Sequence, residues 1–296
     1  MKRILLSLTA IALLAASCGK EGAGVSDAET APKYIAVEAE IGLMTRATTT
    51  GNSTVFDQGD KIKVYAWTDT QTDMPQSFVV AGVDNVKDDG KWIPEIPMLW
   101  KDMTSQHYFL SVYPSRQIAD FTADPFTIDE ADYEQSDLLY AVILSGLKAS
   151  DNPVSLRFDH AMSKLHINMQ FRNQWDNTPE ITSCTARAAK SCKINYLAKT
   201  FQADEQTSVV LNRQTTAANF EASYSGLIIP QAGFRTVVIS IGGQDYIYTH
   251  TEDIPLVPGK FTTLNLVVGR EKIEIGSVDI NDWTEETTLS GGRALQ

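Results

Sequence analysis

Alternation of apolar and polar side chains runs through much of the chain and predicts β-strands. In one segment Leu165, Ile167 and Met169 are apolar, and the residues between them are polar. A period of two is typical of a strand with one face in a core and one in water. Segments that alternate or are rich in β-branched and aromatic residues lie at 35–43, 61–66, 154–158, 165–171, 236–241, 246–248 and 264–268. Because helical periodicity is scarce, we expect an all-β sandwich.

Turn-forming residues separate these segments. Gly242 and Gly243 lie between two of them and predict a hairpin turn. The alanine-rich stretch 185–189 is the one place where a short helix competes with a strand. The polar segment 148–153 is the best candidate for a domain boundary, and a length of 296 residues favours two domains.

The first 17 residues have the pattern of an export signal. Lys2 and Arg3 precede an apolar run at 4–14, which ends in small residues before Cys18. The run is shorter than the roughly 20 residues that a membrane-spanning helix needs. An apolar run that ends in small residues and a cysteine resembles a bacterial lipoprotein signal, in which the cysteine is acylated. This similarity predicts attachment to a membrane through lipid on Cys18; an uncleaved membrane anchor is the alternative.

The charge balance excludes some classes of protein. The chain has 25 lysine and arginine residues against 37 aspartate and glutamate residues, a formal net charge of −12. Binding of nucleic acid, or of an anionic membrane through a basic patch, requires the opposite sign, so we expect neither. The hydrophobic share of 43% and the charged share of 21% are those of a packed globular protein.

Two cysteines remain once Cys18 is assigned to the export signal. Cys184 and Cys192 would meet an oxidising compartment in an exported chain, so a disulfide between them is one alternative and two free thiols are the other. A disulfide would close a short loop and stabilise the fold by about 2–3 kcal/mol. A zinc site at this pair is not expected, because no histidine lies within a dozen residues of it.

Sequence motifs for catalysis, cofactors and metals are missing. The chain has no GxSxG, HExxH, GxGxxG or GxxxxGK[ST] segment. Its four histidines, at 107, 160, 166 and 250, lack the spacing of metal ligands. The segment 84–90 lacks the alternating acids of a calcium loop and is better explained as an exposed turn. We therefore expect no catalytic, cofactor-binding or metal-binding residues, and a secreted hydrolase is the least favoured class.

An ordered set of motifs resembles a known family. The segment F-D-Q-G-D-K-I-K-V-Y-A at 56–66 is similar to the F-x-x-G-D-x-I-x-V-Y-A signature of the fimbrillin-like proteins of Bacteroidetes, the type V pilins. Further segments resemble motifs that follow in the family's order: Y-P at 113–114, D-L-L-Y-A at 137–141, L-R-F-D-H-A-M-S-K-L at 156–165, I-P-Q at 229–231, P-G-K at 258–260 and I-N-D-W at 280–283. Each motif is weak alone, whereas the ordered set behind a lipoprotein signal is specific.

The resemblance implies a fold and a cellular role. The fold would be two transthyretin-like β-sandwich domains in tandem, at 47–150 and 151–296, behind a signal peptide at 1–17 and a tether with a removable strand at 18–46. The role would be that of a structural subunit, in the shaft or at the tip of a surface fimbria, located at the outer membrane and cell surface, with other fimbrial subunits as partners in a homo- or hetero-polymer. The motif residues would be structural, with His160 and Trp283 fixing strands and turns.

The family's assembly mechanism implies a function for the N-terminal segment. An arginine-specific protease would cut after Arg46, so that the mature chain begins at Ala47 and the lipid leaves with the first strand. The apolar face of that strand is formed by Ile35, Val37, Ala39, Ile41 and Leu43. The emptied groove would accept an extended segment of a neighbouring subunit by strand addition.

The C-terminal region contains the candidate donor strand for that exchange. Its apolar residues alternate within two short stretches that are out of phase; they are Ile273, Ile275, Val278 and Ile280. The residues after Trp283 are polar and contain glycine.

An edge strand that is never removed is the alternative interpretation of residues 35–43. The protein would then stay anchored by lipid, as an anchor subunit or as an adhesin that binds a host protein or a glycan. Processing after Arg46 and assembly into oligomers would distinguish the fimbrial subunit from such a binding module.

Overall fold

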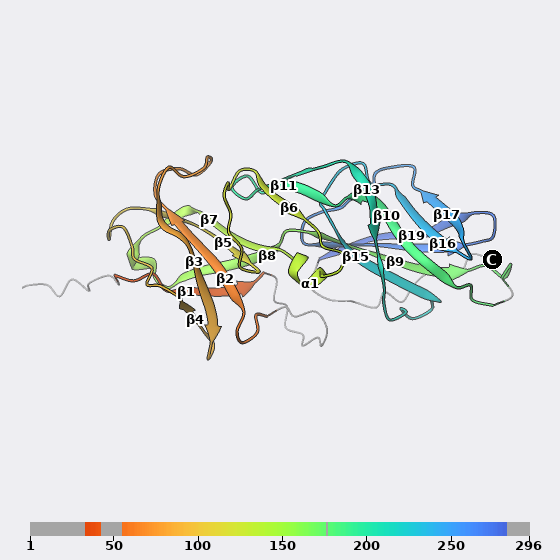
Figure 1. The fold of residues 1–296 in the computed structure, drawn as a ribbon, viewed down its shortest axis with the longest axis horizontal. Helices are drawn as coiled ribbons and strands as arrows, with labels where there is room; N and C mark the ends of the chain where they lie inside the picture. The colour runs from red at the N-terminus through yellow and green to blue at the C-terminus, as the bar shows by residue number, and fades with distance from the viewer. Residues whose placement is uncertain (1–32, 43–54, 176, 283–296) are drawn as a thin grey trace, which may run out of the picture. The chain divides into compact units, whose positions relative to one another are not determined.

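The computed structural model describes residues 33–42, 55–175 and 177–282, which form an all-β fold (Figure 1). The helices in those ranges are α1 (Tyr133–Ser136) and the 3-10 helix η1 (Ala149–Asp151), against nineteen strands. The all-β prediction is therefore confirmed. The tandem transthyretin-like arrangement stays a prediction.

The first sheet has seven strands in the order β1-β8-β7-β5-β2-β3-β4. Its strands are β1 (Val37–Ile41), β2 (Lys61–Trp67), β3 (Phe78–Asp88), β4 (Lys91–Pro94), β5 (His107–Tyr113), β7 (Leu139–Leu147) and β8 (Val154–His160). Neighbouring strands are antiparallel except for β1 and β8, which run parallel. Ile62 and Val64 are fully buried, and so are Tyr65 and Trp67 at adjoining positions of β2. Both faces of this sheet are therefore covered at its centre.

Two further sheets form a β-sandwich. One has the order β14-β15-β9-β18-β19 and the other β13-β10-β16-β17. The strands are β9 (Ser163–Phe171), β10 (Ile181–Ala189), β13 (Gln206–Val210), β14 (Asn212–Arg213), β15 (Ala222–Ile228), β16 (Thr236–Ile241), β17 (Gln244–Thr249), β18 (Lys260–Val268) and β19 (Ile273–Asp282). Their apolar faces share one core, to which Leu165 and Leu264 contribute from the five-stranded sheet and Ala186 and Val237 from the four-stranded sheet.

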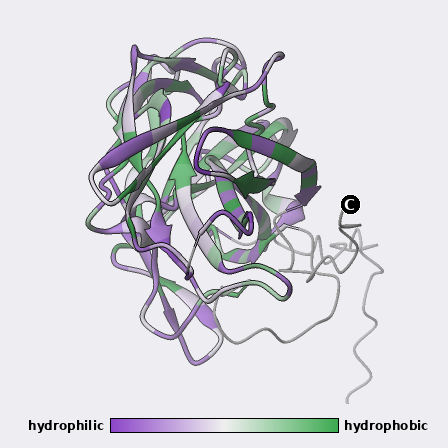
Figure 2. Cartoon of the chain, turned by 90° about the vertical axis from the view of Figure 1, so that its right-hand side faces the viewer, coloured by the Kyte–Doolittle hydropathy of each residue, from purple (hydrophilic) through white to green (hydrophobic). Residues whose placement is uncertain are grey.

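Strand β9 shows the predicted alternation clearly. Leu165, Ile167 and Met169 are fully buried, whereas His166 and Asn168 between them are only half-buried. Figure 2 shows the resulting change between hydrophobic and hydrophilic residues along the strands. The two-residue period in the sequence therefore places this strand's core face correctly.

The chain's two halves share a small fourth sheet. Its order is β12-β11-β6, formed by β6 (Asp124–Thr127), β11 (Ser191–Asn195) and β12 (Thr200–Ala203). Strand β8 lies in the seven-stranded sheet, although it follows the predicted boundary at residue 150. A division of the chain by its two large groups of strands would fall at 161–162, between β8 and β9. The division into two domains stays a prediction.

Two local predictions have clear outcomes. The stretch 185–189 is the end of β10 and not a helix, because it pairs with β13 on one side and with β16 on the other. Ala186 and Ala188 are fully buried there, so small side chains serve close packing and not helix propensity. Gly242 and Gly243 connect β16 to β17 with positive φ angles of 58° and 83°, as expected for a two-residue hairpin turn.

Candidate functional site

The N-terminal strand β1 lies at the edge of the seven-stranded sheet beside β8 (Figure 1). The two strands pair in parallel over five positions, from Val37 opposite Val154 to Ile41 opposite Phe158. The pairing continues at Gly42, whose amide donates to the carbonyl of Phe158 at 2.6 Å. Strand β1 is thus hydrogen-bonded to a strand that lies more than a hundred residues further along the chain.

The residues just before β1 are held from another side. Tyr34 forms an isolated antiparallel bridge with Leu99. The amide of Ile35 donates to the carbonyl of Met98 at 2.9 Å, and the amide of Trp100 donates to the carbonyl of Lys33 at 3.2 Å. The N-terminal segment 33–42 therefore occupies a slot between β8 and residues 98–100. Any strand that replaced it would meet hydrogen-bonding groups on both sides.

The side chains of this segment alternate between core and solvent. Ile35, Val37 and Ile41 are 2%, 5% and 6% exposed, whereas Glu38 and Glu40 point to solvent. Of the other two residues predicted for the apolar face, Ala39 is half-buried and Leu43 lies outside the described residues. The segment that precedes Arg46 thus supplies three large apolar side chains to the core. Removal of the strand stays a prediction, since Arg46 and Ala47 also lie outside the described residues.

An aromatic cluster surrounds Phe56, next to residue 55, where the described residues resume. The ring of Phe56 lies 5.1 Å from Trp92, 5.2 Å from Tyr113 and 5.2 Å from Phe158, with its plane steeply inclined to each of theirs. Such edge-to-face pairs are a favourable aromatic geometry. Phe56, Tyr113 and Phe158 come from three different sequence motifs, and Phe158 is also the pairing partner of Ile41. The motifs therefore converge beside the end of β1.

The glycine and aspartate of the first motif form the turn that leads into β2. Gly59 has a φ of 91°, which favours glycine. Its amide donates to the carbonyl of Lys87 at 2.9 Å, and the Lys87 amide donates to the carbonyl of Asp60 at 2.8 Å. The Asp60 carboxylate accepts hydrogen bonds from the Asp57 amide and from the Tyr113 hydroxyl. These motif residues thus fix the turn and have no catalytic arrangement.

A histidine–aspartate pair joins two further motifs. Nδ1 of His160 lies 2.8 Å from Oδ1 of Asp137, and the Ala161 amide donates to the carbonyl of Leu138 at 2.7 Å. These contacts connect the start of β7 to the end of β8, next to the pairing of Leu139 with His160. This geometry agrees with a structural role for His160. Trp283 lies outside the described residues.

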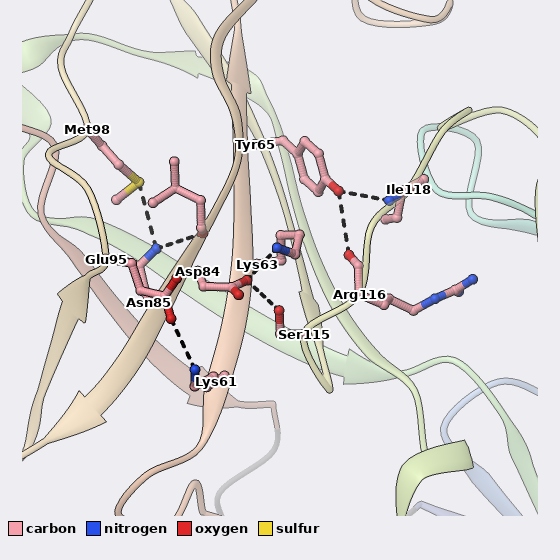
Figure 3. Close-up of polar contacts among 11 residues, drawn as sticks. Lys61, Lys63, Tyr65, Asp84, Asn85, Glu95, Met98, Ser115, Arg116 and Ile118 are labelled. Carbon is pink, nitrogen blue, oxygen red and sulfur yellow. Dashed lines mark hydrogen bonds and ion pairs between the residues drawn. The ribbon is translucent and has the colours of Figure 1, made fainter.

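Polar contacts involve strands β2 and β3 of the seven-stranded sheet (Figure 3). Lys63 forms an ion pair with Asp84 at 2.5 Å, and Asp84 also accepts a hydrogen bond from Ser115. The buried Asn85 donates from Nδ2 to the sulfur of Met98 at 3.7 Å, while its Oδ1 has no hydrogen-bond partner. The buried Nε1 of Trp100 and Oγ of Ser111 also have none. Because an unpaired buried polar atom costs free energy, Asn85, Trp100 and Ser111 each reduce the stability of this part of the fold.

The candidate donor strand is β19, the edge strand of the five-stranded sheet. Its pairing with β18 is irregular: Ser277 lies opposite Asn265 and Ile275 opposite Leu266, which leaves Gly276 as a bulge. This extra residue brings the two out-of-phase stretches onto one face. Ile273, Ile275 and Val278 accordingly pack against the sandwich core, and Ile280 is 44% exposed. Its function as a donor stays a prediction.

Both remaining cysteines are free, buried thiols. Cys184 belongs to the sandwich core, whereas Cys192 lies in β11 within a second cluster that includes Tyr65 and Leu110. Burial raises the pKa of Cys184 and raises that of Cys192 to about 12. The structure therefore holds the free-thiol alternative and not the disulfide, and neither thiol is activated as a nucleophile. Cys18 lies outside the described residues.

A buried polar network that sequence reasoning missed connects the two halves of the chain. The Arg116 guanidinium donates to Asp124 at 2.7 and 3.3 Å, and the Tyr196 hydroxyl donates to Asp124 at 2.7 Å. Burial raises the pKa of the Asp124 carboxyl, opposed by these two partners. The sequence gives no signal for this network, because the three residues belong to no motif and Tyr196 lies 72 positions from Asp124. Its place beside the β6–β11 pairing makes it structural.

The described part of the chain offers no site for metal chemistry. No three histidine, cysteine, aspartate or glutamate side chains in those ranges come together as metal ligands. Among the same residues, no helix has the length and hydrophobicity needed to span a membrane.

Comparison with known proteins identifies the family. The family model described as fimbrillin-like matches residues 45–283. No protein with a curated description matches the chain. The fimbrillin-like family consists of non-enzymatic structural proteins, which confirms the expectation that the chain is not an enzyme.

Solved structures share the fold at low sequence identity. A candidate cell adhesion protein of Bacteroides uniformis is 17% identical with a TM-score of 0.62, covering 85% of this chain and 99% of that one. A second, from Bacteroides ovatus, is 17% identical with a TM-score of 0.60, covering 86% and 99%. A fimbrial protein of Bacteroides vulgatus is 12% identical with a TM-score of 0.54, covering 86% and 100%. The family match spans the strands and motifs described above, from the turn before β2 to the end of β19, and the chain therefore belongs to the fimbrillin-like family.

Proposed function

We propose that this protein is a structural subunit of a cell-surface fimbria, exported as a lipoprotein on Cys18, processed after Arg46 and polymerised by strand exchange. Membership of the fimbrillin-like family supports the fimbrial role. The observation that carries the exchange mechanism is the position of segment 33–42. It fills a slot between β8 and residues 98–100, and it precedes Arg46 in the chain.

The free energy that such an exchange would use follows from the burial of β1. Ile35, Val37 and Ile41 are almost fully buried. At about 1.5–3 kcal/mol for each side chain, their loss would cost the subunit about 5–9 kcal/mol. That is comparable with the whole stability of a typical domain, about 5–15 kcal/mol. A processed subunit would therefore gain most of its missing stability from a partner's strand.

The slot also sets requirements for that strand. In the register of β1 it takes large apolar residues at the positions of Ile35, Val37 and Ile41 and a small one at Ala39. A fully extended β19 in this register would place Ile273 and Ile275 at the positions of Ile35 and Val37, and Ser277 at the position of Ala39. It would also place Asp279 at the position of Ile41, whose side chain contacts the core. Burying an unpaired carboxylate is costly. The groove therefore favours a donor from a different subunit over a second copy of this chain.

Intact mass of the protein from cells tests the proposal. Material sheared from the surface is expected to begin at Ala47, whereas the membrane fraction contains an acylated form that begins at Cys18. An Arg46→Ala variant is expected to yield only the acylated form and no polymer, with Arg213→Ala, at an exposed arginine on β14, as the matched control. Polymer formed normally by Arg46→Ala would overturn processing at this site.

An unprocessed surface adhesin is the second candidate function. In that case only the form beginning at Cys18 would be found, and the slot would never be opened. The extensive hydrogen bonding of segment 33–42 is compatible with a permanent strand. Saturable binding of the anchored monomer to a polysaccharide or a host protein would then identify its function.

A further inference from the structure

We infer that an apolar patch beside the N-terminal segment docks the unprocessed protein onto the surface of the lipid bilayer. The patch consists of Tyr34, Ile93, Ile96 and Leu99. This inference rests on the lipid anchoring of Cys18 that is part of the proposed function. It adds an interaction surface on the folded part of the molecule.

The exposure of the patch is unusual for this protein. Ile96 at 60% and Tyr34 at 57% have the highest exposed fractions of any large hydrophobic side chain in the described residues. Ile93 is 48% exposed and Leu99 is 40% exposed. Exposed apolar groups that gather in one region commonly mark an interaction site, whereas scattered ones do not.

Strand pairing joins two members of the patch, and the others lie nearby. Tyr34 and Leu99 form an antiparallel bridge, Ile93 lies on β4, which contacts β1, and Ile96 lies three residues before Leu99. Trp92, Met98 and Trp100 are buried next to the exposed Ile93 and Leu99, so the chain has a core side and an apolar outer side at these two positions, and Ile96 is exposed in the bend between them. Because buried apolar residues already form the core side, the exposed side chains of the outer residues are available for an interaction with another surface.

The distance to the lipid anchor indicates a membrane as the occupant. Fourteen residues lie between Cys18 and Lys33, and a fully extended chain of that length spans at most about 50 Å. The bilayer that holds the acylated cysteine therefore lies within that distance of Lys33, and Tyr34 is the first exposed large apolar side chain after the tether in the described residues. Aromatic side chains with one polar end are favoured at the membrane interface.

The charges around the patch suit neutral headgroups. Lys33, Lys91 and Lys101 border it and are exposed, so their long side chains can reach headgroup phosphates. Two nearby carboxylates are engaged: Glu95 pairs with Lys61 at 3.0 Å, and Asp102 accepts hydrogen bonds from Thr104 and Ser105. Because the whole chain carries −12, a zwitterionic surface is a better partner than an anionic one.

Processing would dismantle the same surface. A cut after Arg46 releases Lys33 and Tyr34 together with β1, so Leu99 loses its bridge partner. Docking is therefore a property of the unprocessed form only. Release from the membrane and loss of the docking surface would follow from one peptide-bond cleavage.

The test uses the chain beginning at Cys18, coupled through that cysteine to a maleimide lipid in phosphatidylcholine vesicles. Cys184 and Cys192 are buried, so coupling is directed to Cys18. Hydroxyl-radical footprinting then compares this protein with one coupled to a water-soluble maleimide. Modification of Tyr34 is expected to slow about threefold or more on vesicles, because interfacial burial excludes water from apolar groups. Modification of Ile247, 55% exposed on β17, stays unchanged.

Matched variants separate docking from tethering. Ile96→Asp with Leu99→Asp is expected to abolish the protection of Tyr34, and Ile247→Asp to leave it intact; urea unfolding establishes that each variant is folded. Equal modification of Tyr34 on vesicles and in solution would overturn the inference. Protection that needs no vesicles and rises with protein concentration would also overturn it, by assigning the patch to a second copy. The maleimide lipid replaces the natural acyl chains in this experiment, so its result does not depend on acylation in the cell. Acylation is tested separately by the intact mass of the protein from cells.

Discussion

Replacing Ile41 by alanine tests the energetic contribution of the N-terminal strand most directly. Ile41 is 6% exposed and pairs with Phe158, whose ring contacts Phe56 at 5.2 Å. Truncation of a buried isoleucine to alanine costs about 2–5 kcal/mol, and an edge strand can relax around the cavity, so we expect about 2–3 kcal/mol. Urea unfolding of the unprocessed chain should show this loss as a lower midpoint with an unchanged slope.

The same substitution should also act after processing. Once the chain is cut after Arg46, the strand is held by non-covalent contacts alone, and a loss of about 2–3 kcal/mol weakens its retention about 30- to 150-fold. Size-exclusion chromatography with mass detection would measure how fast segment 18–46 leaves. Glu40→Ala is the matched control, because its side chain on the same strand points to solvent. Equal release from Ile41→Ala and Glu40→Ala would refute the view that apolar burial retains β1.

Three further outcomes follow from single sites. Ser111→Ala should raise the free energy of unfolding by about 1 kcal/mol in urea titration, because the buried hydroxyl has no hydrogen-bond partner; a lower stability would show that this oxygen is paired in solution. Burial, with Lys164 nearby, lowers the pKa of His166 from 6.5 to about 4, so the unfolded chain binds the proton more readily and stability falls as the pH drops from 6.5 to 4. His166→Gln should remove about 3 kcal/mol of that fall, and an unchanged slope of stability against pH would contradict it. Asp279→Ile gives β19 the pattern of β1 and should let processed protein self-assemble where the wild type does not; sedimentation velocity would detect the oligomers, and monomeric Asp279→Ile would argue against β19 as a donor.

Local patterning was sufficient to predict the strands whose alternation is simple. In β9 each apolar residue from Leu165 to Met169 points into the core, as its two-residue period indicates. The same reasoning favoured a helix at 185–189 as an alternative, because alanine has high helix propensity. Strand pairing on both sides of β10 overrides that preference, and no window of local sequence contains the two partner strands.

Long-range geometry set the limit for the candidate site. The apolar face at 35–41 could be predicted from spacing, but its parallel pairing with β8 and its bridge to Leu99 join residues distant in sequence. The bulge at Gly276 explains why the apolar residues of β19 fall into two stretches that are out of phase. The network of Arg116, Asp124 and Tyr196 could not be predicted from the sequence, because its contacts depend on burial and not on the types of the three residues.

The parallel pairing of β1 with β8 also has a mechanical consequence. A strand seated in this slot hydrogen-bonds across five consecutive positions, from Val154 to Phe158. A pull along the strand direction loads those bonds in shear, so they resist together and must break together. A pull across the strands would instead peel them one at a time. A fimbria joined through this slot would therefore be strongest when tension runs along the inserted strand.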